Sequence, residues 1–509
     1  MPKSFIRSSS IVAAMTFLSR ILGLVRDFVI ARYFGANGLT DAFLVAFRIP
    51  NFFRRLFAEG AFSQAFLPIL ADVKANKSDK EVQLVINHIA TKLLSILMII
   101  TLISVILAPI IIFLFAWGFY FNTDLTQFNL ASNMLRITFP YLLLISLTAL
   151  SGAILNTYDN FTVPAFTPVL LNISLILCAI YLSKFLSTPI MALAWGVLIG
   201  GILQLIFQIP FLRKLKKLPK IQFGHHKALS TLKKRMLPAL FGVSVSQINL
   251  LVDTMIASTL IAGSVSWLYY SDRLLELPLA LIGITLATVA LARLSNYHAQ
   301  KDTKNFLLTI NKALLFALIL GFPACFGLIF LSQELIITLF QYDAFDLISA
   351  KKTALSLQAY GSGLMAFILI KIFAPVFLSM GDTKTPVKAG VVAMTSNIVL
   401  NLILVQYFGH VGLAVATSIS ALINAALLYF FLVKQSIYKF NNAFYKMLIK
   451  VLFATIIMAL YIFYFESNID LYIDSSMIER AFLVSKTILI SALIYFASLY
   501  ILGVRLKKL

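Results

Sequence analysis

Charged side chains recur inside apolar segments of this sequence, where each one needs a counter-charge or contact with water. The first apolar segment carries Arg20, Arg26 and Asp27 at helical spacing, which makes one polar stripe on an otherwise apolar helix. Placing one ionised side chain at the middle of a bilayer costs about 2.5 to 3.5 kcal/mol. The second and eighth apolar segments carry further charges of both signs: Asp41, Arg48, Arg54, Arg55, Glu59, Asp272, Arg273 and Glu276. We expect these three helices to face one shared, water-filled cavity.

Two interpretations of these charges lead to different chemistry. In the structural interpretation, the carboxylates neutralise arginines in ion pairs that fix the packing of the helices. The arginines outnumber the carboxylates, however, and Asp27 can serve only one of them. A cavity with surplus guanidinium groups suits an anion, and the planar guanidinium matches phosphate oxygens in particular. We therefore expect an anionic substrate, a phosphate or a pyrophosphate.

A second polar group is a candidate cation site. Asp253 lies in the seventh apolar segment, Asn397 and Asn401 lie one turn apart in the eleventh, and Thr417 lies in the twelfth. Carboxylate and amide oxygens are hard ligands, so this group predicts coupling to Na⁺ or H⁺. Asn side chains also bridge membrane helices with no ion present, and both interpretations stay open. No other cofactor is expected, because no Ser-His-Asp set, Cys cluster or glycine-rich phosphate loop stands out.

The composition defines the elements that must position these residues. The chain has 509 residues, of which 60% are hydrophobic and only 12% charged, and its mean hydropathy is +0.94. Soluble domains have roughly 25% charged residues, so the composition excludes a soluble protein and an ordinary nucleic-acid binder. About fourteen apolar stretches have the length of about 20 residues that crosses a bilayer. The sequence therefore predicts an all-α polytopic membrane protein with about fourteen transmembrane helices.

The excess of basic residues is expected to set the orientation in the membrane. Lys+Arg exceed Asp+Glu by a formal charge of +22, and the bases concentrate in alternate connections, above all in residues 213–235. Short loops rich in Lys and Arg stay in the cytoplasm, so both termini are expected to be cytoplasmic. His225 and His226 in this basic linker, and His298 near a helix end, lack a ligand set and are expected at the surface.

An internal repeat organises the chain. Residues 156–164 and 378–386 each join two apolar helices with a polar turn that ends in proline, and nearly the same offset relates Asp27 to Asp253 and Arg48 to Arg273. We expect two six-helix lobes in a parallel repeat, residues 1–220 and 228–435, and two further helices in residues 436–509. Such lobes are the plan of an alternating-access carrier with its substrate site between them.

Several motifs resemble one known family. They are the runs at 19–27 (SRILGLVRD), 40–68 with its core RRLFAEGAFSQAF, 152–156 (GAILN), 164–168 (PAFTP), 263–273 (GSVSWLYYSDR) and 384–388 (KTPVK). They are similar to the MurJ (MviN) family of lipid II flippases, within the multidrug/oligosaccharidyl-lipid/polysaccharide exporter superfamily. The resemblance covers the first twelve apolar segments. One departure is Ala292, where the family usually has proline.

The resemblance implies a substrate, a location and a set of site residues. The substrate would be the undecaprenyl-pyrophosphate-linked disaccharide pentapeptide, moved across the bacterial cytoplasmic (inner) membrane for peptidoglycan synthesis. Membrane lipids and other cell-wall synthesis proteins are the further partners expected. In the family the last two helices form a groove for the lipid tail. The family's cavity charges correspond to Arg20, Arg26, Asp41, Arg54, Arg55, Glu59, Arg273 and Glu276.

Two other functions remain as alternatives. One is an exporter of another polyprenyl-linked oligosaccharide or of a drug, although the surplus of arginines disfavours a cationic drug. The other is a membrane enzyme that acts on polyprenyl phosphates, which would need acidic metal ligands or a base at the cytoplasmic surface. The sequence has no cluster of Asp residues there.

Overall fold

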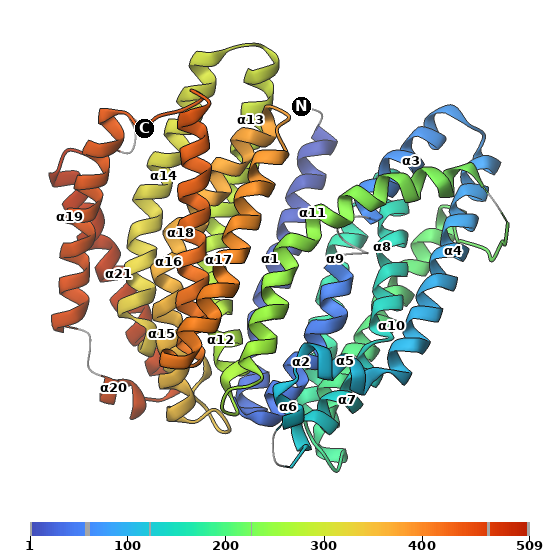
Figure 1. Ribbon diagram of the computed structural model, residues 1–509, viewed down its shortest axis with the longest axis horizontal. Helices are drawn as coiled ribbons and strands as arrows, with labels where there is room; N and C mark the ends of the chain where they lie inside the picture. Colours follow the sequence, from blue (N-terminus) through green and yellow to red (C-terminus); the bar gives the residue numbers. More distant parts are fainter. Residues whose placement is uncertain (1–2, 56–61, 122–123, 225, 466–468, 506–509) are drawn as a thin grey trace. The chain divides into compact units, whose positions relative to one another are not determined.

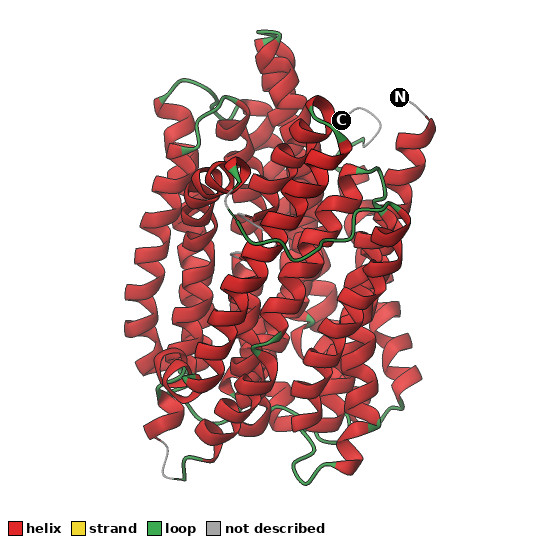
Figure 2. Ribbon diagram, turned by 90° about the vertical axis from the view of Figure 1, so that its right-hand side faces the viewer, coloured by secondary structure: helices red, strands yellow, loops and turns green. Residues whose placement is uncertain are grey.

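The structure, a computed structural model, is built from helices. It describes residues 3–55, 62–121, 124–224, 226–465 and 469–505, and no strand occurs among them (Figure 2). The all-α class predicted from the apolar segments is confirmed. The described chain forms two compact units, Met1–Val265 and Ser266–Leu509.

The first unit contains eleven α-helices among its described residues. In chain order they are α1 (Lys3–Phe34), α2 (Gly38–Phe53), α3 (Ser63–Asn76), α4 (Asp79–Ile106), α5 (Ala108–Phe115), α6 (Gly118–Phe121), α7 (Thr126–Thr138), α8 (Tyr141–Thr157), α9 (Thr162–Ile180), α10 (Met191–Lys214) and α11 (Lys227–Ala257) (Figure 1). A short 3-10 helix, η2 (Leu182–Phe185), follows α9.

Small residues let the helices of the first unit approach closely. On α10, a Cβ atom at Gly200 would lie 2.7 Å from Leu171 Cδ1, and one at Gly201 would lie 2.7 Å from Tyr141 Cδ2. Lipid tails are as apolar as Leu, so helices in a membrane associate through such close packing rather than through the hydrophobic effect. Glycine therefore fixes α10 against its neighbours α9 and α8.

The second unit begins near the start of α12 (Ser264–Pro278), whose first two residues belong to the first unit. It continues through a π-helical turn, η3 (Leu279–Ile284), and then α13 (Thr285–Ala299), α14 (Thr303–Phe330), α15 (Ser332–Phe340), α16 (Leu347–Ser379), α17 (Lys384–Phe408), α18 (His410–Lys434), α19 (Asn442–Phe465), α20 (Ile469–Ile473) and α21 (Met477–Ile501). α16 packs against both α14 and α18, and α19 packs against α14 and α21. α13 continues as a helix through Ala292, the position of the departure from the family pattern.

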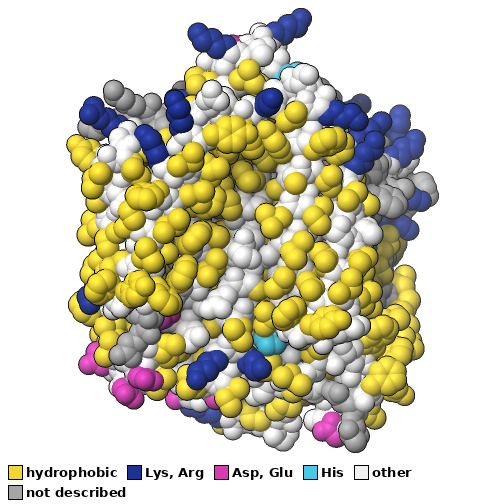
Figure 3. Space-filling model, turned by 60° about the vertical axis from the view of Figure 1, so that its left-hand side comes forward, with side chains coloured by type: hydrophobic (Ala, Val, Ile, Leu, Met, Phe, Trp, Pro, Cys, Tyr) yellow, Lys and Arg dark blue, Asp and Glu magenta, His cyan; other side chains and the backbone are white. Residues whose placement is uncertain are grey.

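Eleven helices among the described residues are long and apolar enough to cross a membrane. The other three predicted spans correspond to α1, to the α2–α3 pair and to α11, and α1 carries Arg20, Arg26 and Asp27. The count of fourteen therefore stays a prediction. The visible surface in Figure 3 is largely apolar, and α19 exposes Ile449 and Phe453 in the way expected of a helix that faces lipid.

The boundary between the compact units differs from the boundary of the predicted repeat. The repeat divides the chain in the basic linker before α11, whereas α11 packs with α3, α4 and α5 in the first unit. The repeat describes symmetry in the sequence and stays a prediction. The grouping of α11 matters for Asp253, because this residue lies on α11 and so belongs to the first unit.

Candidate functional site

Arg26 and Asp27, two members of the polar stripe of α1, form a buried ionic cluster in the first unit. Arg26 donates from Nε and Nη2 to Asp27 Oδ1 at 3.0 and 2.7 Å, and from Nη1 to Asn172 Oδ1 on α9 at 3.0 Å. Asn172 Nδ2 then donates to the Ser19 carbonyl oxygen at 3.1 Å. Arg26 and Asp27 are only 9% and 2% exposed. The guanidinium is therefore held in a fixed orientation by an anion and an amide.

Arg20, one and a half turns before Arg26 on α1, has a different environment. Its side chain is exposed, and it makes no hydrogen bond or ion pair with the residues that the structure describes. The same helix therefore presents one guanidinium that is held by the protein and one that is available to a ligand.

The charges at the start of α2 fix the turn between α11 and α12. Asp41 is 2% exposed, and its Oδ2 accepts a hydrogen bond from the Gly263 backbone N–H at 2.6 Å. Gly263 has a φ of 99°, in the left-handed region that favours glycine. About two turns further along α2, Arg48 Nη1 donates to Thr254 Oγ1 on α11 at 2.6 Å. Both contacts hold α2 to the second half of α11 and the turn that follows it.

The C-terminal end of α2 leads into the remaining predicted arginines of the first unit. Arg54 Nε donates to Asn51 Oδ1 at 3.0 Å, and Arg54 and Arg55 are both half-buried. Pro50 lies inside α2, in the last turn before this end, and α3 begins only at Ser63. Glu59, one of the carboxylates predicted as counter-charges, lies outside the described residues.

In the second unit, α12 presents an arginine that stays accessible. Arg273 Nη1 donates to Glu276 Oε2 at 2.8 Å, and the two side chains are 32% and 47% exposed. The guanidinium carbon also lies 4.8 Å from the centre of the Tyr269 ring, a cation–π distance. The π-helical turn η3 follows within three residues of Glu276, and such turns are frequent at functional sites.

Three of the four predicted cation ligands lie together in the second unit. Asn401 Nδ2 donates to Asn397 Oδ1 at 3.1 Å, and Asn397 Nδ2 donates to Thr417 Oγ1 at 3.3 Å, which joins α17 to α18. Asn397 and Asn401 are 1% and 0% exposed. Asp253, the fourth, is on α11 in the first unit, whereas the predicted repeat assigns all four residues to the second lobe. The three-residue group can join two helices or supply oxygens to a cation, so the ion site stays a prediction.

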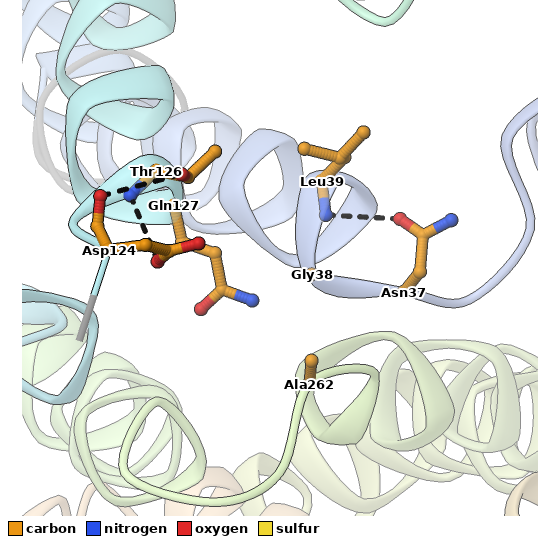
Figure 4. Close-up of a pocket in the computed structure, with 7 residues that line it drawn as sticks. All are labelled: Asn37, Gly38, Leu39, Asp124, Thr126, Gln127 and Ala262. Atoms are coloured by element: carbon orange, nitrogen blue, oxygen red, sulfur yellow. Dashed lines mark hydrogen bonds between the residues drawn. The ribbon is translucent and has the colours of Figure 1, made fainter. Parts of the chain in front are cut away.

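A pocket of about 560 Å³ opens at one end of the first unit (Figure 4). Its lining comes from the N-terminal end of α2 with its cap, the N-terminal end of α7 with the segment just before it, and the turn after α11: Asn37, Gly38, Leu39, Asp124, Thr126, Gln127 and Ala262. Asn37 caps α2, since its Oδ1 accepts from the Leu39 N–H at 3.0 Å. The predicted arginines do not line this pocket, so it is distinct from the candidate substrate site.

The geometry adds partners that sequence reasoning did not single out. Asn172 Oδ1 accepts a hydrogen bond from Arg26, and Thr254 Oγ1 accepts one from Arg48. The Gly263 backbone N–H donates to Asp41. The sequence does contain an indication of the role of Asn172. An amide side chain inside an apolar helix needs a polar partner, as is also true of Asn397. The partners of Arg48 and Asp41 depend on α11 meeting α2, which no local pattern indicates.

The sequence matches known proteins along nearly its whole length. It fits the family model described as lipid II flippase MurJ over residues 30–483. A probable lipid II flippase MurJ of Vibrio cholerae is 44% identical, with 100% of this chain and 98% of that protein covered. The lipid II flippase MurJ of Burkholderia cenocepacia is 38% identical, with 97% of this chain and 96% of that protein covered.

Solved structures with the same fold include a MurJ flippase and a MATE family transporter. A lipid II flippase MurJ in an inward closed conformation superposes with a TM-score of 0.80 at 31% identity, covering 96% of this chain and 99% of that chain. A multidrug resistance MATE family transporter in an inward-facing conformation gives a TM-score of 0.68 at 15% identity, covering 86% and 98%. The second likeness is one of fold alone.

Proposed function

This chain belongs to the lipid II flippase MurJ family, and from that premise we propose that it moves lipid II from the cytoplasmic to the outer leaflet. The family consists of transporters rather than enzymes, and its activity serves peptidoglycan biosynthesis. The substrate would be the undecaprenyl-pyrophosphate-linked disaccharide pentapeptide. The multi-pass chain would lie in the bacterial inner membrane with both termini in the cytoplasm, as its basic connections favour.

The accessible guanidinium groups carry the proposal that the pyrophosphate is bound by arginine. Arg20 is exposed on α1, and Arg273 is 32% exposed on α12 while Glu276 and Tyr269 orient it. An arginine that the protein already orients loses little rotamer freedom when it binds a phosphate in a bidentate manner. Arg26 would act as a fixed positive group on the same helix as Arg20, because Asp27 binds its Nε and Nη2 and Asn172 binds its Nη1.

Transport would proceed by alternating access between two conformations of the carrier. The solved MurJ structure similar to this chain is described as inward closed, which supports a cycle with a closed state. A ligand shifts such an equilibrium only by the difference in its affinity for the two states. The pyrophosphate must therefore contact the arginines differently in the inward and outward conformations. α19 and α21, which expose apolar side chains, would provide the groove for the undecaprenyl tail.

Coupling to a cation is a separate part of the proposal. Asn397, Asn401 and Thr417 would provide amide and hydroxyl oxygens for Na⁺, and Asp253 would provide a carboxylate for Na⁺ or H⁺. What supports this is the clustering of three of the four groups within one unit at 1% exposure or less for the two amides. Other cell-wall synthesis proteins are expected partners.

Leaflet exchange of a labelled lipid separates the proposed function from its alternatives. Purified protein is reconstituted in proteoliposomes with fluorescent lipid II in both leaflets, and a membrane-impermeant quencher reports the accessible fraction over time. A flippase lets the quencher reach nearly all of the label without chemical change, whereas a membrane enzyme converts the lipid. A labelled polyprenyl-linked oligosaccharide without the pentapeptide, tested in parallel, separates a lipid II flippase from a general exporter. Exchange equal to that of protein-free liposomes would contradict the proposal.

A further inference from the structure

The chain between α10 and α11 lies along α4 as an extended segment. We define residues 217–224 as the strap; they form no helix, and all of them are described. At its start, Lys217 is 2% exposed and pairs with Asp79 at the beginning of α4. Just beyond its end, His226 Nε2 bonds to Glu81 Oε1 at 3.1 Å, so both ends are fixed to the first turn of α4.

The strap matches α4 in a repeating register. Leu218 O accepts from Gln83 Nε2 at 3.0 Å, and Lys220 N donates to Asn87 Oδ1 at 2.9 Å. Gln222 N then donates to Thr91 Oγ1 at 2.8 Å. Two extended residues span about 6.7 Å and four helical residues rise about 6 Å, so every second strap residue meets every fourth α4 residue.

This register makes the strap a loop that follows α4 and returns. From Gln83 to Thr91 it advances about 12 Å along the α4 axis. Gly224 then turns the chain back past His88, with a φ of 141° that favours glycine. His226, expected from sequence to be a surface residue, is instead half-buried, and its Nδ1 accepts from the Ala228 N–H at the start of α11.

The same register turns two large apolar side chains outward at the tip of the loop. Backbone groups of every second strap residue are hydrogen-bonded to α4, at Leu218, Lys220 and Gln222. The alternate residues Ile221 and Phe223 are 71% and 78% exposed. Hydrogen bonds therefore hold apolar groups in an exposed position. Two apolar side chains that hydrogen bonds of the backbone keep exposed indicate a surface that a membrane or another molecule covers.

The level of the tip along α4 indicates what covers it. The strap reaches Thr91, the next residue is the exposed Lys92, and the continuous apolar part of α4 begins at Leu93. The tip therefore lies where a membrane-spanning helix passes from headgroups into hydrocarbon. The exposed bases around the strap are Arg213, Lys214, Lys216, Lys220, Lys227, Lys233, Lys234 and Arg235. Aromatic side chains and bases at this depth are typical of interfacial membrane anchors.

We propose that the strap is a membrane anchor that inserts Ile221 and Phe223 into the cytoplasmic leaflet while the surrounding bases bind the phosphates of anionic lipids. The apolar tip selects a bilayer over a soluble anion, and the charge complementarity selects an anionic leaflet over a zwitterionic one. Because α11 begins at the end of the strap, the anchor fixes the N-terminal end of α11 to the membrane surface. The inference does not depend on the transported substrate.

A spin label at the tip tests the insertion. The two native cysteines, Cys178 and Cys325, are buried, so a nitroxide reagent labels an introduced cysteine selectively. Phe223→Cys is labelled in the full-length protein in phosphatidylglycerol nanodiscs, and its collisions with oxygen and with a water-soluble nickel complex are compared. Lys77→Cys, in the exposed turn before α4, is the matched control. We expect oxygen to dominate at position 223 and the nickel complex at position 77.

The lipid preference is tested by removing charges. Lys216→Gln, Lys220→Gln and Lys227→Gln are combined, and detergent-solubilised protein is titrated with phosphatidylglycerol. We expect the affinity to fall by up to about fivefold per removed base. The control combines three exposed lysines from the end of α18, the following connection and α19, far from the strap in the sequence: Lys434→Gln, Lys439→Gln and Lys446→Gln.

Three results would overturn the anchor. The first is a label at position 223 that is as accessible to the nickel complex as the label at position 77, which would leave the tip to a protein partner. The second is an equal loss of affinity in both triple variants. The third is displacement of phosphatidylglycerol by inorganic phosphate, which would make the basic surface a site for a soluble anion.

Discussion

The ionic clusters of α1 and α12 use the same residue types in opposite ways. Arg26 on α1 is 9% exposed and has Asp27 and Asn172 as partners, whereas Arg273 on α12 is 32% exposed and has Glu276 beside it. A buried pair that loses one partner leaves an uncompensated charge, but an exposed pair can rearrange with water. The α1 cluster is therefore expected to hold the fold, and the α12 pair to bind substrate.

The largest effect is expected from breaking the α1 cluster. Asp27→Ala removes the carboxylate that binds Nε and Nη2 of the buried Arg26, which should lower the free energy of unfolding by about 3 to 5 kcal/mol. The measurement is thermal unfolding of the purified variant in detergent. Asp27→Glu, which keeps the charge, is the control and should lose less. A variant as stable as the wild type would show that water or another group compensates Arg26.

Removing the α12 guanidinium should affect binding rather than folding. Arg273→Ala should weaken lipid II binding by about 1.5 to 3 kcal/mol, the value of a hydrogen bond to a charged group. Its melting temperature should stay close to that of the wild type, because the side chain is partly exposed. Arg273→Lys should restore binding only in part, since a point charge lacks the bidentate geometry. A large loss of stability would place Arg273 with Arg26 as a structural group.

Asp41 tests whether a charge predicted for the substrate site is structural as well. Asp41→Ala leaves the Gly263 N–H buried without its acceptor, which should cost about 1 to 3 kcal/mol of stability. Asp41→Asn keeps an acceptor oxygen and should fold better than Asp41→Ala. Urea or thermal unfolding of both variants measures the contribution of Asp41 to the turn at Gly263. Lipid II binding by the same variants measures the contribution of its charge to the substrate site. Equal stability of the two variants would contradict the role in the turn.

The amide group of α17 and α18 should give a smaller effect. Asn401→Leu removes the hydrogen bond to Asn397, and such bonds between membrane helices average about 0.6 kcal/mol. A site for a cation would respond differently, because the variant would then lose the dependence of flipping on a Na⁺ gradient. Flipping with and without the gradient, in the variant and in Asp253→Asn, decides between the two. An unchanged ion response in well-folded variants removes the coupling site.

The smallest effect on stability is expected at Asp302, which lies outside the membrane-spanning helices. Its exposed helix cap is a reference for the charged groups of α1 and α12. It caps α14, and hydrogen bonds from the backbone and side chain of Asn305 lower its pKa below the usual range. A lowered carboxyl pKa contributes stability above the pKa of the unfolded chain, and this contribution is lost as the pH falls through the folded pKa. Asp302→Asn should therefore flatten the acid limb of the stability curve slightly. An unchanged acid limb would mean that this cap does not contribute.

The sequence predicted the helices and most of the polar residues, but not which of them meet. Runs of apolar residues with turn prolines locate the helices, because backbone groups in lipid must bond within their own segment. The stripe on α1 was also visible, since Arg20, Arg26 and Asp27 recur at helical spacing. The sequence does not indicate which of these side chains is held by the protein, because Arg26 is bound by Asn172 from a helix far away in the sequence.

The partners of the basic linker between α10 and α11 were also not predictable from local sequence patterns. Its bases indicated a cytoplasmic location, but nothing local indicated that Gln83, Asn87 and Thr91 on α4 would hold it extended. Polar residues four apart on an apolar helix were a signal for some partner. The identity of that partner required the fold, because it lies more than a hundred residues away along the chain.

A binding cycle with Arg273→Ala tests the proposed contact between Arg273 and the pyrophosphate of lipid II. Wild type and Arg273→Ala are each titrated with lipid II and with the same lipid carrying a single phosphate. If the guanidinium contacts the pyrophosphate, the substitution should weaken lipid II binding by about 10- to 150-fold, as expected for about 1.5 to 3 kcal/mol, and weaken binding of the monophosphate lipid much less. Equal losses for both lipids would contradict the claim.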